Sequence, residues 1–126
     1  MIYFIGAGPG AADLITVKGK ELLEKADLVI YAGSLVNPEL LKYCKPECTI
    51  MNSATMTLEE VIAAMVPAAQ AGQLVVRLHT GDPSIYGAHR EQIDLLRSYN
   101  PDYEVVPGVS SLCAAAACLQ AEYTLP

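Results

Sequence analysis

The sequence predicts an α/β fold, a five-stranded, mainly parallel sheet with helices on both faces. Short apolar runs alternate along the chain with segments of helical periodicity, which is typical of parallel strands joined by right-handed crossovers. Residues 74–78 are rich in branched side chains, as expected for a strand buried on both faces of such a sheet. The chain has 126 residues, of which 52% are hydrophobic, enough for one domain with its own core.

The predicted strands are short apolar runs bounded by turn-forming residues. They are residues 2–5, 28–31, 49–51, 74–78 and 103–106. After the first strand, Thr16 is placed to cap a helix that ends at Asp27. After the second strand, Asn37 followed by Pro38 predicts the start of a short helix.

The helix before the fourth strand has the clearest start signal. Thr57 and Glu60 form a capping box, in which each side chain satisfies a free backbone donor of the other, and Met56 and Val61 are placed as a hydrophobic staple. Pro67 lies inside the helical pattern, where it removes a backbone hydrogen bond. We therefore expect a kink or a break at this proline.

Two further helices follow the fourth and fifth strands. His89, Ile93 and Leu96 lie at helical spacing in the first of them. The second begins near Ser110, and its alanine run, residues 114–117, is expected to pack closely against the sheet.

Charge and hydropathy exclude several classes of function. With 14 acidic and 8 basic residues the net charge is −6, which argues against a nucleic-acid surface and leaves no basic patch to attract an anionic membrane. The longest apolar run, residues 112–119, is far shorter than the roughly 20 residues of a membrane-spanning helix. The apolar first residues follow no basic region, which favours a strand over a signal peptide. We expect a cytoplasmic protein with neither nucleic-acid nor membrane partners.

The cysteine spacing does not match a metal or redox motif. Cys44 and Cys48 are separated by three residues, and Cys113 and Cys118 by four, unlike the Cys-x-x-Cys pattern. We expect four free thiols and no metal site.

Three loops that follow predicted strands are rich in glycine and proline. They are Gly-Ala-Gly-Pro-Gly at residues 6–10, Gly-Asp-Pro-Ser-Ile-Tyr-Gly at 81–87 and Pro-Gly-Val-Ser-Ser at 107–111. In open α/β sheets ligands bind outside the carboxyl ends of the strands, and glycine lets the backbone approach a ligand closely. The alternative is that these are ordinary connections, in which Asp82, Ser110 and Ser111 serve only as helix or turn caps.

These three stretches, in this order and at this spacing, resemble the cofactor loops of the tetrapyrrole methylases, which use S-adenosylmethionine. The resemblance covers essentially the whole chain. Residues 3–16, 31–36 and 77–80 are most similar to members that methylate a corrin precursor in cobalamin biosynthesis. The resemblance implies a methyltransferase with a tetrapyrrole substrate, S-adenosyl-L-homocysteine as the product of its cofactor, and a homodimeric state.

The resemblance also implies cofactor contacts at the positions that match the family's motifs. These are Pro9, Thr80, Gly81, Asp82, Ile85, Ser110 and Ser111, with Tyr86 as a further candidate. Asp82 would hydrogen-bond a polar group and Ile85 would make apolar contact. The substrate cleft would include Gly8, Gly10 and His79. The family has an aspartate after Gly-Pro-Gly, but this chain has Ala11 and Ala12 before Asp13, so that acid is absent or its role has passed to Asp13. No catalytic residue is assigned.

A tetrapyrrole that carries many carboxylates calls for basic contacts. The candidates in this chain are Lys18, Arg77, His79 and Arg90. The alternative is that a second domain supplies them.

A rival interpretation comes from residues 6–11, which fit the Gly-x-Gly-x-x-Ala fingerprint of dinucleotide-binding domains and would indicate an oxidoreductase. That fingerprint requires an acid at the end of the second strand, where this chain has Tyr31. It also requires a helix that begins within the glycines, whereas the predicted cap of the first helix is Thr16. Another methylase of the same superfamily, acting on a different precorrin or on uroporphyrinogen, and a noncatalytic binding module also remain open.

Members of the family have two α/β domains of comparable size. Residues 1–126 resemble the amino-terminal one, and the second domain is absent from this chain. Because the family's cofactor lies between the domains, we expect residues 1–126 to fold but not to turn over substrate alone.

Overall fold

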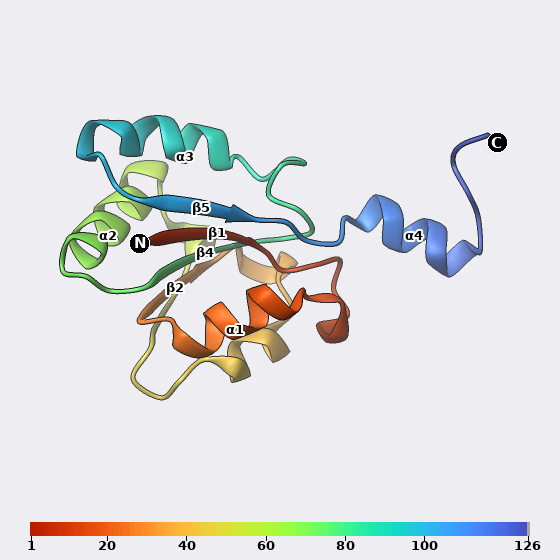
Figure 1. Cartoon of the computed structure of the whole chain (residues 1–126), viewed down its shortest axis with the longest axis horizontal. Coiled ribbons are helices and arrows are strands. Elements are labelled where there is room, and N and C mark those ends of the chain that lie inside the picture. The colour runs from red at the N-terminus through yellow and green to blue at the C-terminus, as the bar shows by residue number, and fades with distance from the viewer. Residues whose placement is uncertain (126) are drawn as a thin grey trace.

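The structure is a computed structural model that describes residues 1–125. It contains a five-stranded sheet (Figure 1) made of β1 (Ile2–Gly6), β2 (Leu28–Tyr31), β3 (Thr49–Asn52), β4 (Val75–His79) and β5 (Tyr103–Val106). The strand order is β3-β2-β4-β1-β5, and all four pairings are parallel. The predicted α/β fold is confirmed, and the sheet is parallel throughout.

Helices cover both faces of the sheet. The α-helices are α1 (Val17–Lys25), α2 (Leu58–Gln70), α3 (His89–Leu96) and α4 (Ser111–Leu119). The short 3-10 helices are η1 (Ala12–Leu14), η2 (Gly33–Leu35), η3 (Pro38–Tyr43), η4 (Ser53–Thr55) and η5 (Arg97–Tyr99). As Figure 1 shows, α2 and α3 lie over one face and α1 lies over the other.

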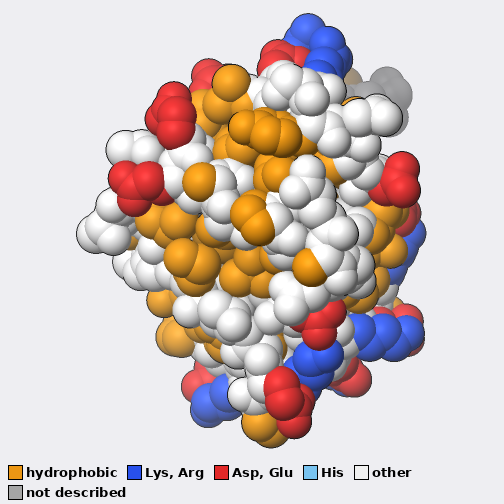
Figure 2. Space-filling view, turned by 90° about the vertical axis from the view of Figure 1, so that its left-hand side faces the viewer, with side chains coloured by type: hydrophobic (Ala, Val, Ile, Leu, Met, Phe, Trp, Pro, Cys, Tyr) orange, Lys and Arg blue, Asp and Glu red, His pale blue; other side chains and the backbone are white. Residues whose placement is uncertain are grey.

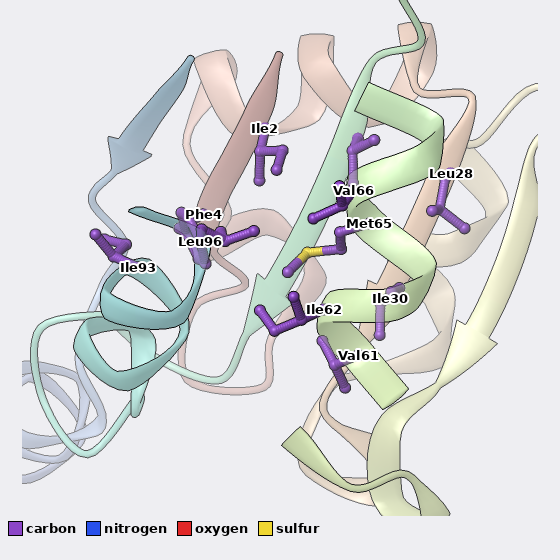
Figure 3. Packing of buried hydrophobic residues seen from close by; sticks show 11 residues of the cluster. Ile2, Phe4, Leu28, Ile30, Val61, Ile62, Met65, Val66, Ile93 and Leu96 are labelled. Carbon is purple, nitrogen blue, oxygen red and sulfur yellow. The ribbon is translucent and has the colours of Figure 1, made fainter. Parts of the chain in front are cut away.

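The core is split by the sheet into two hydrophobic clusters, because successive side chains of a strand point to opposite faces. Phe4 and Ile30 pack with Met65 of α2 and Leu96 of α3 on one face (Figure 3). The other cluster joins the opposite side of the sheet to α1 and η3. It contains Ile5, Ala7, Leu23, Ala26, Val29, Val36, Leu40, Val76, Leu78 and Val106. Every residue of β4 is buried, as its branched sequence predicts.

The predicted helix caps are present. The Thr16 hydroxyl accepts a hydrogen bond from the Gly19 N–H at 3.0 Å, and the Thr57 hydroxyl accepts one from the Glu60 N–H at 3.1 Å. The second half of the capping box differs from the prediction, because the Glu60 carboxylate accepts from the Thr57 hydroxyl at 3.3 Å. The helix that Asn37 caps is the 3-10 helix η3.

The expected break at Pro67 does not occur. Helix α2 continues through the proline to Gln70. Pro67 and Ala63, whose carbonyl would have bonded the missing N–H, both lie on the exposed side of the helix. Water can therefore hydrate that carbonyl, and the helix keeps its packed face.

The expectation that α4 packs against the sheet is wrong. No residue of α4 is buried, and Figure 1 shows the helix projecting beyond the carboxyl edge of the sheet. Leu112 is 59% exposed and Leu119 is 75% exposed. Unlike α1 and α3, α4 does not turn back over the sheet after its strand, so it has no sheet beneath it (Figure 1).

The topology creates a crevice between β1 and β4. These strands are neighbours, but the chain leaves β1 toward α1 on one face and leaves β4 toward α3 on the other. Such a switch point leaves space between the diverging loops, and ligands of α/β sheets bind there.

Within residues 1–125, no helix is long and apolar enough to cross a membrane.

Candidate functional site

Three glycines bring the loops at the carboxyl edge into backbone contact. We call Gly6, Gly81 and Gly108 the glycine junction. A Cβ built on Gly6 would lie 2.6 Å from both the Gly108 Cα and the Gly81 carbonyl oxygen, and one built on Gly108 would overlap the same oxygen. Nearby, Gly8 and Gly81 form an antiparallel bridge, with N–H to carbonyl distances of 3.2 and 2.8 Å. No larger residue fits at Gly6 or Gly108 without moving the backbone, and Gly81 has a φ of 58°, which residues with a Cβ rarely adopt.

A depression of about 220 Å³ lies beside this junction, and we call it the carboxyl-edge depression. It is lined by Pro9, Thr80, Gly81, Asp82, Ile85, Tyr86, Ser110 and Ser111. The structure thus brings together, from three loops, all eight positions that the sequence analysis associates with cofactor contact. Ile85 is 47% exposed and the Tyr86 side chain is fully exposed, so this side of the depression faces solvent.

The loop after β4 is tightly folded. A Cβ on Gly87 would overlap the Pro83 carbonyl oxygen, so only glycine fits there. Tyr86 and Ala88 have φ angles of 57° and 54°, in the left-handed region that residues with a Cβ rarely adopt. The conformation that presents Ile85 and Tyr86 is therefore held by the rest of the loop against local preference.

The Asp82 carboxylate joins two of the loops. Its Oδ1 accepts a hydrogen bond from the Ser84 N–H at 2.8 Å, and its Oδ2 accepts one from the Gly108 N–H at 2.9 Å. Burial raises the pKa of the Asp82 carboxyl, but the hydrogen bonds from Gly108 and Ser84 outweigh it and bring the pKa below its usual range. The carboxylate is ionised at neutral pH.

Other polar side chains also bind backbone of neighbouring loops. The Thr80 hydroxyl donates to the Leu35 carbonyl at 2.9 Å, and the His89 Nδ1 lies 2.7 Å from the Pro83 carbonyl. The Asn37 amide donates to the Gly10 carbonyl at 2.7 Å. The sequence predicts only the cap at Asn37, because the second partner of this side chain lies 27 residues earlier and leaves no local signal.

Ser110 caps a helix and also lies at the carboxyl-edge depression. Its hydroxyl oxygen accepts a hydrogen bond from the Leu112 N–H at 3.2 Å and so caps α4, and the residue also lines the depression. The hydroxyl proton of Ser110 is free to donate to a ligand. Ser111 lies in the first turn of α4, with its side chain exposed.

The three residues expected along a substrate cleft do not line the carboxyl-edge depression. Neither Gly8 nor Gly10 lines the carboxyl-edge depression. His79 is only 3% exposed and stacks on Phe4 at a ring-centroid distance of 6.0 Å, on the face covered by α2 and α3. Its Nε2 is buried without a hydrogen-bond partner. Burial, with smaller effects of Arg77 and His89, lowers the pKa of His79 to about 3, so its ring is neutral at pH 7.

Arg77 is buried as well and is not available to a substrate carboxylate. Its guanidinium donates to the Gln92 side chain, the Ile30 carbonyl and the Ser53 hydroxyl, each at 3.1 Å. Burial lowers its pKa to about 10, so it remains charged at pH 7. These bonds tie β4 to β2, η4 and α3. Of the other basic candidates, Lys18 pairs with Glu104 and Arg90 is exposed.

Two features of the glycine loop disagree with a dinucleotide site. The 3-10 helix η1 follows the loop and α1 begins only at Val17, so the first helix does not open within the glycines. β2 ends at Tyr31, followed by Ala32 and Gly33, where the fingerprint requires an acid. Among residues 1–125, no three His, Cys, Asp or Glu side chains are grouped as metal ligands would be.

A second depression of about 220 Å³ lies at the opposite edge of the sheet. Its lining includes Met1, Val66, Ala69, Tyr99 and Pro101. Figure 2 shows hydrophobic side chains gathered over this end of the molecule, where α2 and α3 end. None of the glycine-rich loops reaches it.

Comparisons with known proteins agree with these motifs. A family model described as Tetrapyrrole (Corrin/Porphyrin) Methylases matches residues 1–126. The cobalt-precorrin-4 C(11)-methyltransferase of Methanocaldococcus jannaschii is 60% identical over 125 residues, which are 99% of this chain and 48% of that protein. The chain therefore spans about half the length of this relative.

Solved structures of methyltransferases also resemble this chain. The X-ray structure of a cobalamin biosynthetic enzyme, cobalt precorrin-4 methyltransferase, matches with a TM-score of 0.95 at 51% identity, covering 99% of this chain and 52% of that one. A uroporphyrin-III C-methyl transferase from Thermus thermophilus, complexed with S-adenyl homocysteine, matches with a TM-score of 0.77 at 35% identity, covering 91% of this chain and 47% of that one.

The glycine junction predicts a large difference between two glycine substitutions. Gly108→Ala should lower the free energy of unfolding by about 3 kcal/mol or more, because the new Cβ would overlap backbone on two sides. Gly72→Ala, at a φ of 81° with nothing within 4 Å of the Cβ, should cost only about 1 to 2 kcal/mol of backbone strain. Urea denaturation measures both, and equal losses would contradict the steric account.

Buried His79 predicts an acid-sensitive component of stability. The pKa of His79 is lowered in the folded state. The ring is therefore protonated below about pH 6.5 in the unfolded chain, but only below about pH 3 in the folded chain. Stability is therefore lost as the pH falls through this window, by roughly 1 to 2 kcal/mol between pH 6.5 and pH 5. His79→Phe should remove this loss in denaturation curves at the two pH values. An equal loss in both proteins would show that His79 is not its source.

Proposed function

The chain belongs to the tetrapyrrole (corrin/porphyrin) methylase family, and on that basis we propose that it is the amino-terminal domain of a methyltransferase that uses S-adenosylmethionine. The proposed reaction is methylation of cobalt-precorrin-4 at carbon 11, in cobalamin biosynthesis. The observation that carries the proposal is the convergence of all three motif loops on one depression at the β1/β4 switch point. The 60% identity to a cobalt-precorrin-4 C(11)-methyltransferase supports the choice of substrate.

The lining of the carboxyl-edge depression suits an S-adenosyl ligand. None of the eight lining residues is basic, which fits a ligand without phosphate groups and disfavours a dinucleotide. Pro9 and Ile85 offer apolar surface, and the Ser110 hydroxyl offers a donor. The loop backbone of Thr80 and Gly81 lies at the lining too. These groups match a ligand that has both apolar and neutral polar parts.

The small size of the depression supports the proposal that another part of the protein forms its second wall. At about 220 Å³ it is smaller than the roughly 300 to 1,000 Å³ of typical small-molecule pockets, and it is open on the side of Ile85 and Tyr86. We propose that a second α/β domain, in the half of the relatives' length that this chain does not span, closes it. That domain would also supply basic contacts to the substrate, since Arg77 and His79 are buried.

The proposed chemistry asks little of acid or base groups. When bound, S-adenosylmethionine supplies a methyl group that its sulfonium already activates. The residues of this chain then bind, orient and exclude water, and a well-oriented pair of reactants can gain an effective molarity of about 10⁵ M or more. No catalytic acid or base is assigned, consistent with the absence of a titratable side chain other than Asp82 and Tyr86 at the lining.

The remaining parts of the proposal are supported by the family resemblance and by the net charge of −6. We propose that the complete enzyme is a cytoplasmic homodimer that binds neither nucleic acid nor membranes.

Thermal unfolding tests the proposed ligand. In thermal unfolding of this chain, S-adenosylhomocysteine should raise the midpoint, with a stabilisation of about 2.7 kcal/mol at a hundredfold excess over its Kd, whereas NADH and NADPH should not. Ile85→Asp places a charge on the apolar side of the depression and should abolish the shift. Leu95→Asp, at a position of similar exposure on α3, should not. Stabilisation by a dinucleotide alone would overturn the proposal.

Methyl transfer tests the proposed reaction. A full-length protein that contains this chain should transfer one methyl group from S-adenosylmethionine to cobalt-precorrin-4, as followed by mass spectrometry of the corrinoid. Residues 1–126 alone should show no transfer, because one wall of the pocket and the orientation of the substrate are missing. Methylation by residues 1–126 alone would refute the two-domain proposal. Methylation of uroporphyrinogen in place of cobalt-precorrin-4 would refute the proposed substrate.

A further inference from the structure

We propose that Asp82 is a positioning residue, whose carboxylate fixes the width of the carboxyl-edge depression without itself contacting the cofactor. We call its hydrogen bonds from the Ser84 and Gly108 N–H groups the Asp82 bridge. This inference rests on the proposed function, since it assigns a task within the proposed cofactor site. It replaces the expectation, drawn from the family motif, that the side chain of Asp82 bonds the cofactor directly.

The two carboxylate oxygens are already engaged within the protein. Oδ1 accepts from the loop that contains Asp82 itself, and Oδ2 accepts from the loop after β5. Both donors are backbone N–H groups, and bonds from such donors to a carboxylate are stronger than bonds between neutral groups. Each oxygen has a second acceptor site, but the carboxylate could turn toward a ligand's donor only by giving up one of these backbone bonds.

The bridge links the two sides of the depression. Ser84 precedes Ile85, which lies on one side, and Gly108 lies two residues before Ser110, which lies on the other. The glycine junction prevents the loops from moving closer, because their backbones are already in contact there. The Asp82 bridge opposes their moving apart. The spacing between Ile85 and Ser110 is therefore limited in both directions.

No basic side chain bonds to the carboxylate. Within the described chain, the titratable group whose charge acts on Asp82 is His89 at the start of α3, and His89 is itself held by the Pro83 carbonyl at 2.7 Å. The carboxylate thus owes its place to backbone donors and not to an ion pair. The bridge therefore positions a loop without a cationic partner that a ligand could displace from the carboxylate.

The test is amide hydrogen exchange in the full-length protein, read at Gly108 by NMR or by mass spectrometry of its peptide. Asp82→Asn should speed the exchange of the Gly108 amide by about tenfold or more at neutral pH, because its acceptor loses its charge. Asp94→Asn is the matched control, since it removes the same charge from an exposed position on α3 whose partner is Arg97. The control should leave the Gly108 amide unchanged. Unchanged exchange in Asp82→Asn would overturn the proposal.

The wild-type protein tests whether the bridge survives ligand binding, even if the Asn variant does not fold. When S-adenosylhomocysteine is added, the Gly108 amide should exchange at the same rate or more slowly, because the bridge stays intact. Faster exchange would mean that the carboxylate leaves Gly108 to bind the ligand, which would overturn the proposal. A complete failure to bind S-adenosylhomocysteine would instead count against the proposed function, while exchange in the ligand-free protein would still test the bridge.

Steady-state kinetics give a second readout, which distinguishes misorientation of the cofactor from weaker binding alone. If the spacing of the loops orients the cofactor, Asp82→Asn should raise the KM for S-adenosylmethionine and also lower kcat, each by about tenfold. Loss of a uniform contact would raise KM and leave kcat unchanged, and that outcome would contradict the proposal.

Discussion

The close approach of three backbone segments at Gly6, Gly81 and Gly108 is the constraint on which the rest of the site depends. Strands β1, β4 and β5 are adjacent in the sheet, so the loops that leave them must share the space at one edge. A side chain at Gly6 or Gly108 would force these loops apart, because a Cβ there would overlap backbone. The glycines let the loops meet, and the depression forms beside that meeting point.

The polar side chains around the junction bind the protein's own backbone. Asp82 accepts from Gly108, Thr80 donates to Leu35, and Asn37 donates to Gly10. Each bond joins two loops that are distant in sequence, so the loops are ordered before any ligand arrives. Such preorganisation lowers the conformational cost of binding, since less of the site must be fixed when the ligand binds. A ligand then meets backbone groups, apolar surface and a few free hydroxyl protons.

The sequence was sufficient for features that local patterns determine. Apolar runs located the five strands, and hydroxyl residues located the caps of α1 and α2, because these signals lie within a few residues of the element they predict. The motif loops also gave all eight residues that line the depression. The direction of α4, the burial of His79 and the partners of Asp82 and Asn37 could not be predicted. Each depends on residues brought together only by the fold, and Gly108 lies 26 positions from Asp82.

The strand β4 shows how the buried interior supports the loop that follows it. Its alternation sends Val76 and Leu78 into the apolar cluster under α1, and Arg77 and His79 toward α3. Arg77 binds Gln92 of α3, and His89 at the start of that helix binds the Pro83 carbonyl. The loop from Thr80 to Gly87 is thus fixed to the glycine junction at one end, to α3 at the other, and to the neighbouring loop by Asp82 between them. Because all three attachments act on one short segment, its left-handed residues can be kept in a conformation that the segment would not hold alone.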